Sequence, residues 1–348
     1  MGASATSVLR VLRHPKLVGA LGLGFVGVVV LWLGVNFVKD PTYFVNIALD
    51  GLTRGTIYGV VALGYTLVYG ILQLINFAHG DIFSQSGLVA STIILSVLGL
   101  SSASSNAAVA GAVVLTLLIT VPMYAAINGT IERIAYRPLR HAPRLAPLIT
   151  AVGVSFITFN VSLGLWGVDF ESGSDLIPQG DAFTIGEIQV TWKLVIALVI
   201  IVPTLLVLSW FVSSTRQGKA MRAVAQDTEA SAMMGINVNR TISVTFFIAG
   251  GLAAVAGLVY FLEFQVRYDT GFELGLIAFT AAVLGGIGNL PGAVLGALLI
   301  GFIQSFNEGL LWYAPGGDWT RSIVFGILIA VLVFRPEGLL GERTPEGA

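Results

Sequence analysis

The chain contains no cysteine among its 348 residues, and it is poor in charge. The missing thiols exclude disulfides, thiolate metal ligands, iron–sulfur clusters and a cysteine nucleophile. Charged residues make up 11% of the sequence, against about 25% in an average soluble protein. The 18 Lys and Arg residues are balanced by 19 Asp and Glu residues, so the basic excess that nucleic-acid binding requires is missing as well.

Motifs for metal, nucleotide and protease chemistry are missing too. The three His residues are far apart, and none belongs to an HExxH zinc motif. Gly218-Lys219-Ala220 lacks both the spacing and the hydroxyl residue of a Walker A loop, so we expect no nucleotide hydrolysis by this chain itself. Because GxSG and GxGD are also absent, we expect a protein that is not an enzyme and that holds no metal and no cofactor.

What the chain has is apolar sequence in long runs. Apolar residues make up 55% of it and the mean hydropathy is +0.88, which is more than the surface of one soluble globule can hide. A membrane-spanning helix needs about 20 apolar residues. We therefore predict an all-α polytopic membrane protein. The candidate spans are Leu17–Val38, Val45–Leu72, Ile82–Leu100, Ala107–Ile127, Pro147–Val168, Leu194–Ser213, Ile242–Leu262 and a shorter segment, Arg321–Phe334.

A further apolar stretch, Leu274–Asn307, is interrupted by the sequence GGIGNLPG at residues 285–292. Each arm is short for a span, so we expect a broken or re-entrant pair whose half-helix ends point at the middle of the membrane. A structural corner without ligand contact would need the same glycines, and both interpretations stay open. The expected count is eight to ten transmembrane helices including this pair.

Positive charge predicts the orientation. Most Lys and Arg residues lie before residue 17, in loops 128–147 and 214–241, and at the C-terminus. Because such residues stay on the cytoplasmic side, we expect both termini inside and the acidic loop 169–192 outside. The run Leu17–Val38 is longer than the apolar region of a signal peptide, so we expect it to remain as an additional first helix.

Polar residues close to membrane depth are candidates for function. Asn76, His79 and Asp81 lie between two apolar spans, after a run of glycines at near-helical spacing. They either line a pathway or form a wetted turn in which Asp81 caps the next helix. Elsewhere, we expect Asp50 to pair with Arg54 four residues on, and Glu263 to mark a helix end at the outer surface.

The segment from Ser214 to Arg240 is polar, rich in alanine and free of proline. Met221, Val224 and Met233 are spaced so that they share one apolar face, and Gly235 is placed to end a helix. A helix resting on lipid headgroups would show a similar pattern. Because no large aromatic residue lies on the apolar side, we favour docking to a protein partner.

At these three stretches the sequence resembles the permease subunits of branched-chain amino acid ABC importers of the LivH type. The resemblance is most specific over residues 64–81, 222–237 and 284–297. It implies the ABC importer permease fold, with a permease domain over residues 44–338 that includes the cytoplasmic coupling segment 214–241. Residues 1–16 would then be a cytoplasmic tail, 17–43 the additional helix with an outer loop, and 339–348 a second cytoplasmic tail.

ABC importer permeases carry a cytoplasmic EAAxxxG segment that docks into the ATPase subunit. Residues 229–235 match it with Ser231 in place of the second alanine, while the I-x-L-P that follows in the fuller pattern is absent. The resemblance thus implies a coupling role for Asp227, Glu229, Ala230, Ser231 and Gly235. The pathway candidates are Asn76, His79, Gly285, Gly286, Gly288 and Asn289.

The resemblance also implies the partners: a LivM-like second permease, two ATP-binding subunits and an extracytoplasmic substrate-binding protein, in a bacterial or archaeal plasma membrane. Import of urea or a short-chain amide is the alternative, because urea permeases share these motifs. A secondary transporter or channel is a weaker alternative, because it would need charge pairs at the midplane, and this sequence has almost none.

Overall fold

The computed structural model describes residues 15–73, 76–140, 142–143, 145–335 and 337–341. The expected N-terminal tail lies almost wholly outside the described residues, as do residues 342–348 of the expected C-terminal tail. The long helices are α2 (Pro15–Lys39), α3 (Pro41–Leu72), α4 (Ala78–Ser91), α5 (Asn106–Ile131), α6 (Leu145–Trp166), α7 (Trp192–Ser214), α10 (Val238–Glu263), α11 (Thr270–Gly285), α12 (Leu290–Gly309) and α13 (Gly317–Phe334).

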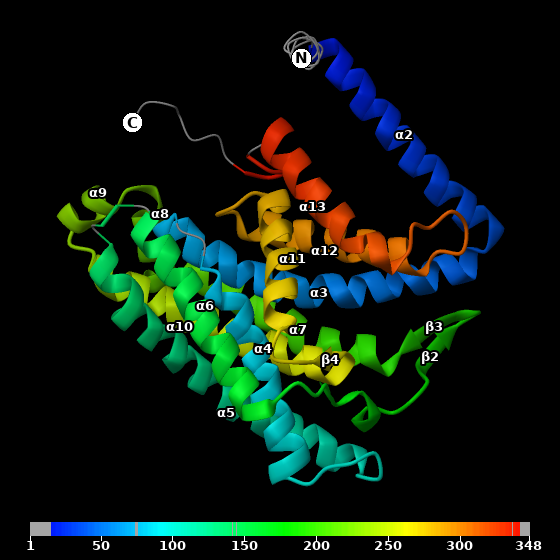
Figure 1. Ribbon diagram of the computed structural model, residues 1–348, viewed down its shortest axis with the longest axis horizontal. Helices are drawn as coiled ribbons and strands as arrows, with labels where there is room; N and C mark the ends of the chain where they lie inside the picture. The colour runs from blue at the N-terminus through cyan, green and yellow to red at the C-terminus, as the bar shows by residue number, and fades with distance from the viewer. Residues whose placement is uncertain (1–14, 74–75, 141, 144, 336, 342–348) are drawn as a thin grey trace.

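Two pairs of shorter elements mark opposite ends of the molecule. Helices α8 (Arg216–Gln226) and α9 (Thr228–Met233) lie at the left of Figure 1, and the hairpin of β2 (Asp181–Ile185) and β3 (Ile188–Thr191) lies at the right. We call these the coupling end and the hairpin end. The remaining short elements are the π-helical turns η1 (Thr92–Val97) and η2 (Glu132–Tyr136), the 3₁₀ turns η3 (Arg137–Leu139) and η4 (Ser174–Leu176), and strands β1 (Glu171–Ser172) and β4 (Gln265–Val266).

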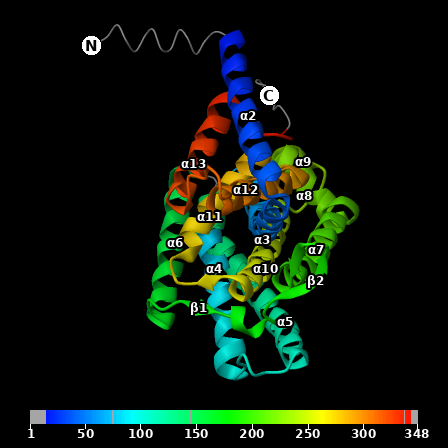
Figure 2. The same cartoon turned by 90° about the vertical axis from the view of Figure 1, so that its right-hand side faces the viewer.

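The prediction of an all-α polytopic membrane protein is confirmed. Among the described residues, eight helices are long and apolar enough to cross a membrane. Helix α11, with 16 residues, is shorter. In Figures 1 and 2, α2 projects from the bundle. Its C-terminal end is attached to the loop before α13, where Trp32 and Asn36 donate to the carbonyl of Trp312 over 2.8 and 3.2 Å.

The centre of the bundle is α3. Pro41 stands in its first turn and Asp40 accepts a hydrogen bond from the amide of Tyr43, which fixes where the helix begins. Its glycines allow α12 to approach closely, as the sequence predicts. A Cβ atom at Gly55 would lie 2.8 Å from the Cα of Leu298, closer than atoms can pack.

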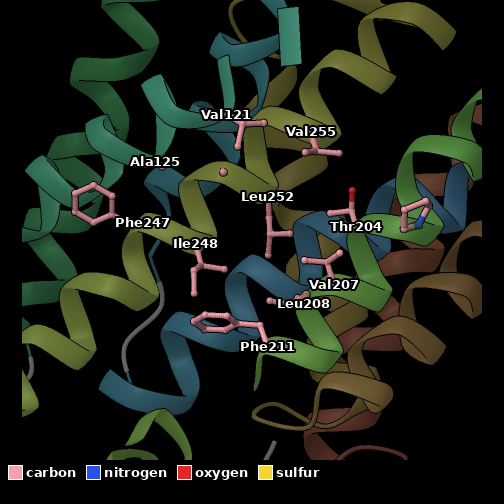
Figure 3. Close-up of a pocket in the computed structure, with 12 residues that line it drawn as sticks. Val121, Ala125, Thr204, Val207, Leu208, Phe211, Phe247, Ile248, Leu252 and Val255 are labelled. Carbon is pink, nitrogen blue, oxygen red and sulfur yellow. The ribbon is translucent and has the colours of Figure 1, made fainter. Parts of the chain in front are cut away.

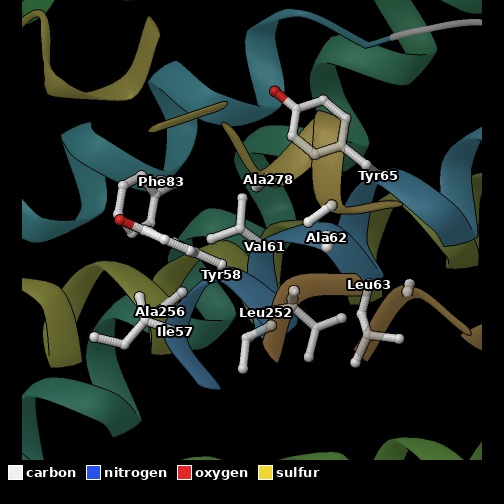
Figure 4. Packing of buried hydrophobic residues seen from close by; sticks show 14 of the residues in the cluster. Ile57, Tyr58, Val61, Ala62, Leu63, Tyr65, Phe83, Leu252, Ala256 and Ala278 are labelled. Atoms are coloured by element: carbon white, nitrogen blue, oxygen red, sulfur yellow. The ribbon is translucent and has the colours of Figure 1, made fainter. Parts of the chain in front are cut away.

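Side chains of three other helices pack against α3. Ile57, Val61 and Tyr65 of α3 pack with Phe83 of α4, Leu252 and Ala256 of α10, and Ala278 of α11 (Figure 4). Helices α3 and α10 are mostly buried, whereas α5, α6, α7 and α13 expose most of their apolar surface. Because every apolar side chain facing lipid is already in its preferred solvent, the outer helices need no polar face.

The loop 169–192 is partly folded, which the sequence analysis does not anticipate. Strands β2 and β3 form an antiparallel hairpin with Ile185 opposite Ile188, and β1 pairs with β4 antiparallel. The hairpin is attached to the start of α3: Thr42 donates to Glu187 over 3.1 Å, and the amide of Gln189 donates to Asn46 over 3.1 Å.

The broken pair that the sequence predicts is present, and its break lies beside the C-terminal end of α3, where a Cβ atom at Gly70 would lie 3.6 Å from the Cα of Gly288. Helices α11 and α12 meet at the coupling end, where Gly285 lies against Gly292, and both run to the hairpin end. There, Glu273 of α11 forms an ion pair with Arg321 of α13. The glycines therefore form a corner between α11, with 16 residues, and α12, which is long and apolar enough to cross a membrane. Eight described helices meet that criterion, the lower end of the expected range.

Two minor predictions are wrong. Arg54 forms its ion pair with Glu308 of α12, at 3.0 Å, rather than with Asp50 on its own helix. The close approach of α3 and α12 brings the Glu308 carboxylate within reach, which sequence spacing alone does not reveal. Glu263 does end α10, but it is buried rather than at the surface.

An apolar groove of about 590 Å³ lies between α5, α7 and α10 (Figure 3). Its lining side chains are hydrocarbon except at Thr204, and they include Val121, Leu208 and Phe247. A polar solute would find almost no hydrogen-bond partner on these walls. The groove therefore fits a lipid chain better than a transport pathway.

Candidate coupling segment and pathway

The polar segment between α7 and α10 folds as two short helices. The hydroxyl of Thr215 accepts from the amide of Gly218 over 3.0 Å and begins α8. Asp227 ends α8, and its carboxylate accepts from the amide of Ala230 over 2.8 Å, which begins α9. One carboxylate thus fixes the angle between the two helices.

Helix α9 ends at Gly235 through a Schellman motif. Gly235 has φ of +83°, and the amides of Gly235 and Ile236 donate to the carbonyls of Ala232 and Ser231 over 3.0 Å each. The prediction that Gly235 ends a helix is therefore confirmed. A side chain at this φ would be strained, so the chain leaves α9 in this direction because the residue is glycine.

One face of the segment is attached to the bundle and the other is open. Met221, Val224 and Ser231 are buried, whereas Glu229 is exposed. Met233 and Met234 are each 83% exposed. Two large apolar side chains at the tip of a polar segment are typical of a surface that is covered by a partner.

Arg222 connects α8 to the end of α7, a role that the sequence analysis misses. Its guanidinium donates to the carbonyls of Val212 and Ser213 over 2.5 and 3.3 Å. These carbonyls belong to the last turn of α7 and have no partner within that helix. The two hydrogen bonds therefore attach α8 to the C-terminal end of α7.

The corner between α11 and α12 is held by its own backbone and by the C-terminal segment. Gly286 and Gly288 have φ of +109° and +92°. The amides of Leu339 and Leu340 donate to the carbonyls of Leu284 and Gly285 over 2.8 and 2.9 Å. Gly285 and Gly286 are packed against backbone, which supports the structural interpretation of these two residues.

Asn289 fixes the start of α12. Its Oδ1 accepts from the amide of Gly292, and its Nδ2 donates to the carbonyl of Leu340, each over 2.8 Å. In contrast, a Cβ atom at Gly288 would have no neighbour within 4 Å. Gly288 and Asn289 border open space, whereas Gly285 and Gly286 do not.

That space is a cavity of about 380 Å³ at the coupling end. Four parts of the chain surround it, and its lining includes Thr66 and Gly70 of α3, Ser209 and Val212 of α7, Met221 and Arg222 of α8, and Gly288, Asn289 and Pro291 of the corner. The coupling segment and the glycine corner, which are far apart in the sequence, thus form walls of one cavity.

The residues at 76–81 do not form a wetted turn. Asn76, His79 and Asp81 are all buried. Asn76 accepts from the hydroxyl of Tyr136 over 2.7 Å, and Asp81 accepts from the hydroxyl of Ser155. The His79 ring packs edge-on against Tyr65 with centroids 4.9 Å apart. The expectation that Asp81 caps the next helix is wrong, because α4 already begins at Ala78.

A second buried polar network lies close to the coupling segment. Glu132 is fully buried and accepts from Arg140 and from the hydroxyl of Ser243, the latter over 2.6 Å. Arg140 also donates to Asn239. Burial lowers the pKa of the Arg140 guanidinium, and the charge of Glu132 opposes this shift. The network joins the loop after α5 to the first turns of α10, where the coupling segment returns to the bundle.

Comparison with known proteins gives consistent relatives. Residues 47–333 match the family described as branched-chain amino acid transport system, permease component. The chain is 38% identical to the high-affinity branched-chain amino acid transport system permease protein BraD of Pseudomonas aeruginosa, over 87% of this chain and 98% of that protein. It is 34% identical to the corresponding protein LivH of Escherichia coli, over 87% and 97%. PsaBC from Streptococcus pneumoniae in complex with Fab is similar with a TM-score of 0.44 at 16% identity, covering 87% of this chain and 95% of that chain.

Proposed function

The chain belongs to the family of branched-chain amino acid transport permeases, and we propose that it forms one half of the translocation pathway of an ATP-driven importer. It is a multi-pass membrane permease component of a multi-subunit ABC transport system. Permeases of this family lack an ATPase domain and bind no cofactor themselves. The missing Walker A motif agrees with this.

The observation that carries the proposal is the cavity shared by α8 and the corner between α11 and α12. An ATPase subunit that binds α9 would move α8 together with it. Because α8 forms one wall of that cavity, the movement would change the shape of the cavity. ATP-driven closure would then rock the helices between inward-open and outward-open states, because the ATPase dimer binds the two states with different affinity. Gly288 and Asn289 would face the pathway at its cytoplasmic end.

The partners follow from the same assignment. A second permease would supply the other half of the pathway, and two ATP-binding subunits would dock under the α8–α9 segments of the two permeases. A substrate-binding protein would dock at the hairpin end. BraD and LivH are permeases of branched-chain amino acid transport systems, which supports branched-chain amino acids as the substrate.

The orientation is open to a direct test, because the chain has no cysteine to give background labelling. We expect Thr184→Cys at the hairpin end to react with a membrane-impermeant maleimide in intact cells. Gln226→Cys at the coupling end should react only after permeabilisation. Both positions are exposed in this chain, so their accessibility is matched when the chain is expressed without its partner subunits. The opposite labelling pattern would show that the termini lie outside.

The assembly is tested by purifying the tagged chain in mild detergent from its own organism and identifying the proteins that accompany it. We expect a second permease and ATP-binding subunits in stoichiometric amounts. Recovery of the chain alone, as a monodisperse species that still transports solute, would contradict the proposal.

A further inference from the structure

A second cavity, of about 360 Å³, lies beside strand β4 and the start of α11, with Phe170 at the beginning of the loop that carries the hairpin. Its size is within the range of roughly 300–1,000 Å³ that small-molecule sites occupy. Unlike the groove in Figure 3, it has charged walls, contributed by α3, α10, α11, α12, α13 and the strand segments. Its lining includes Arg54, Tyr58, Phe170, Tyr260, Phe264, Arg267, Asp269, Glu273, Leu274, Ile277, Gln304 and Arg321. We call it the hairpin-end pocket.

Every guanidinium in the pocket has a carboxylate partner, but the pairs differ in geometry. Arg267 meets Asp269 through two nitrogens at 2.6 and 2.5 Å, and Arg321 meets Glu273 through two nitrogens at 2.6 Å each. Arg54 is paired with Glu308 at 3.0 Å between Nη1 and Oε2, and its guanidinium also lies 5.4 Å from the centre of the Phe264 ring. Arg267 and Arg321 each hold a carboxylate with two hydrogen-bonding nitrogens, a geometry that the Arg54 pair does not show, so the Arg54 guanidinium keeps N–H donors for a further acceptor.

The surroundings of Arg54 are fixed in position. Tyr58 is buried and donates to the Oε1 of Gln304 over 2.8 Å. Gln304 in turn donates to Glu308 over 3.0 Å, and Thr320 donates to the same carboxylate oxygen over 3.0 Å. Arg54 and Glu308 are each only 26% exposed. Because its neighbours hold the Arg54 guanidinium in place, binding of a negatively charged group there would not require the side chain to be ordered first.

Charge and apolar surface are arranged for one kind of ligand. Arg54 lies on the wall formed by α3, and Glu273 lies on the wall formed by α11. Phe264, Leu274 and Ile277 supply apolar surface beside them. The lining holds three arginines and two carboxylates, and Glu308 behind the lining pairs with the third arginine, Arg54. With the charges balanced in this way, neither an anion nor a cation is favoured over a molecule that carries both charges.

We propose that the hairpin-end pocket binds an α-amino acid with an apolar side chain, with Arg54 holding its carboxylate and Glu273 its ammonium group. This inference rests on the proposed transport function, and it locates the substrate on the outer part of the path. The carboxylate of the ligand occupies the unused side of the Arg54 guanidinium. Glu273 keeps its pair with Arg321, since a carboxylate has lone pairs for several donors.

The binding test uses the purified complex in lipid nanodiscs, without the binding protein, so that the permease alone is observed. Binding of L-leucine is measured by saturation-transfer NMR in competition with two analogues. One is 4-methylpentanoate, which lacks the ammonium group, and the other is 3-methylbutylamine, which lacks the carboxylate. The variants are Arg54→Gln, Arg54→Lys and the control Lys39→Gln, which removes a positive charge beside Trp312 at the same end.

For the wild type and Lys39→Gln, we expect leucine to bind and both analogues to compete. Arg54→Gln should weaken leucine binding at least tenfold and abolish competition by 4-methylpentanoate, while 3-methylbutylamine still competes. Arg54→Lys keeps the charge and the pair with Glu308 but lacks the planar fork, so binding should weaken less, by about threefold to tenfold. If Arg54 had only a structural role, its replacement would weaken competition by both analogues and not by 4-methylpentanoate alone.

Equal leucine affinity and unchanged competition in Arg54→Gln and Arg54→Lys would overturn the inference. So would an absence of leucine binding by a wild-type complex that takes up leucine with ATP and its binding protein. In both cases, ATP-driven leucine uptake by the same preparation would still support the proposed transport function, so only the location of the binding site would be contradicted. A wild-type complex that takes up no leucine contradicts the proposed function itself.

Discussion

Replacing Met233 and Met234 together by Asp is expected to detach the ATP-binding subunits from the permease pair. The two side chains are among the most exposed apolar groups of the described residues, and they stand at the tip of the α8–α9 segment. Burying a methionine contributes about 1.5–3 kcal/mol. Loss of both contacts should therefore weaken docking at least about a hundredfold, since about 1.4 kcal/mol corresponds to a factor of ten.

The measurement is the yield of ATP-binding subunits that co-purify with the tagged chain, together with ATPase activity. Met233→Leu with Met234→Leu is the matched control, because it keeps the apolar surface and should retain both. The second permease should co-purify with every variant, since α9 lies at the end of the bundle. Undiminished docking of the Asp variant would show that this tip is not the coupling surface.

A valine in place of Gly301 is expected to prevent α3 and α12 from packing. A Cβ atom at this position would lie 2.5 Å from the Cα of Gly55 and 2.5 Å from the carbonyl oxygen of Gly51. These atoms belong to backbone, so no side chain is able to move aside. We expect a cost of about 3 kcal/mol or more, at the upper end of overpacking effects, and loss of the monodisperse protein in size-exclusion chromatography.

Gly111→Val is the matched control for this helix substitution. Gly111 lies in α5, where an added Cβ would have no neighbour within 4 Å. The control should elute as the wild type does and keep its thermal stability within about 0.5 kcal/mol, as surface substitutions usually do. Equal behaviour of the two valine variants would mean that the α3–α12 contact does not depend on glycine.

The sequence was sufficient to predict the spans and the coupling segment, because both are encoded locally. Hydropathy over about 20 residues predicts a span wherever its neighbours lie. Likewise, the cap at Asp227 and the helix end at Gly235 depend on a few residues on either side of each. The glycines of α3 indicate a close helix contact, although not the identity of the partner helix.

The contacts that could not be predicted from the sequence are those between helices far apart in the chain, because they depend on which helices pack together. Arg54 pairs with Glu308, far along the chain, because α3 packs against α12. The corner at residues 286–289 lies beside the C-terminal end of α3, far back along the chain. Asn76 is buried because Tyr136 of a distant π-helical turn reaches it. No local pattern in the sequence carries these pairings.

The most direct test of the central claim is uptake of radiolabelled L-leucine into proteoliposomes that contain this chain, its second permease and the two ATP-binding subunits. The binding protein is supplied outside and ATP inside, and urea is measured in parallel. We expect leucine to accumulate only with ATP and hydrolysis-competent ATPase subunits, and urea not to accumulate. Uptake by the chain without ATPase subunits, or accumulation of urea but not leucine, would contradict the account.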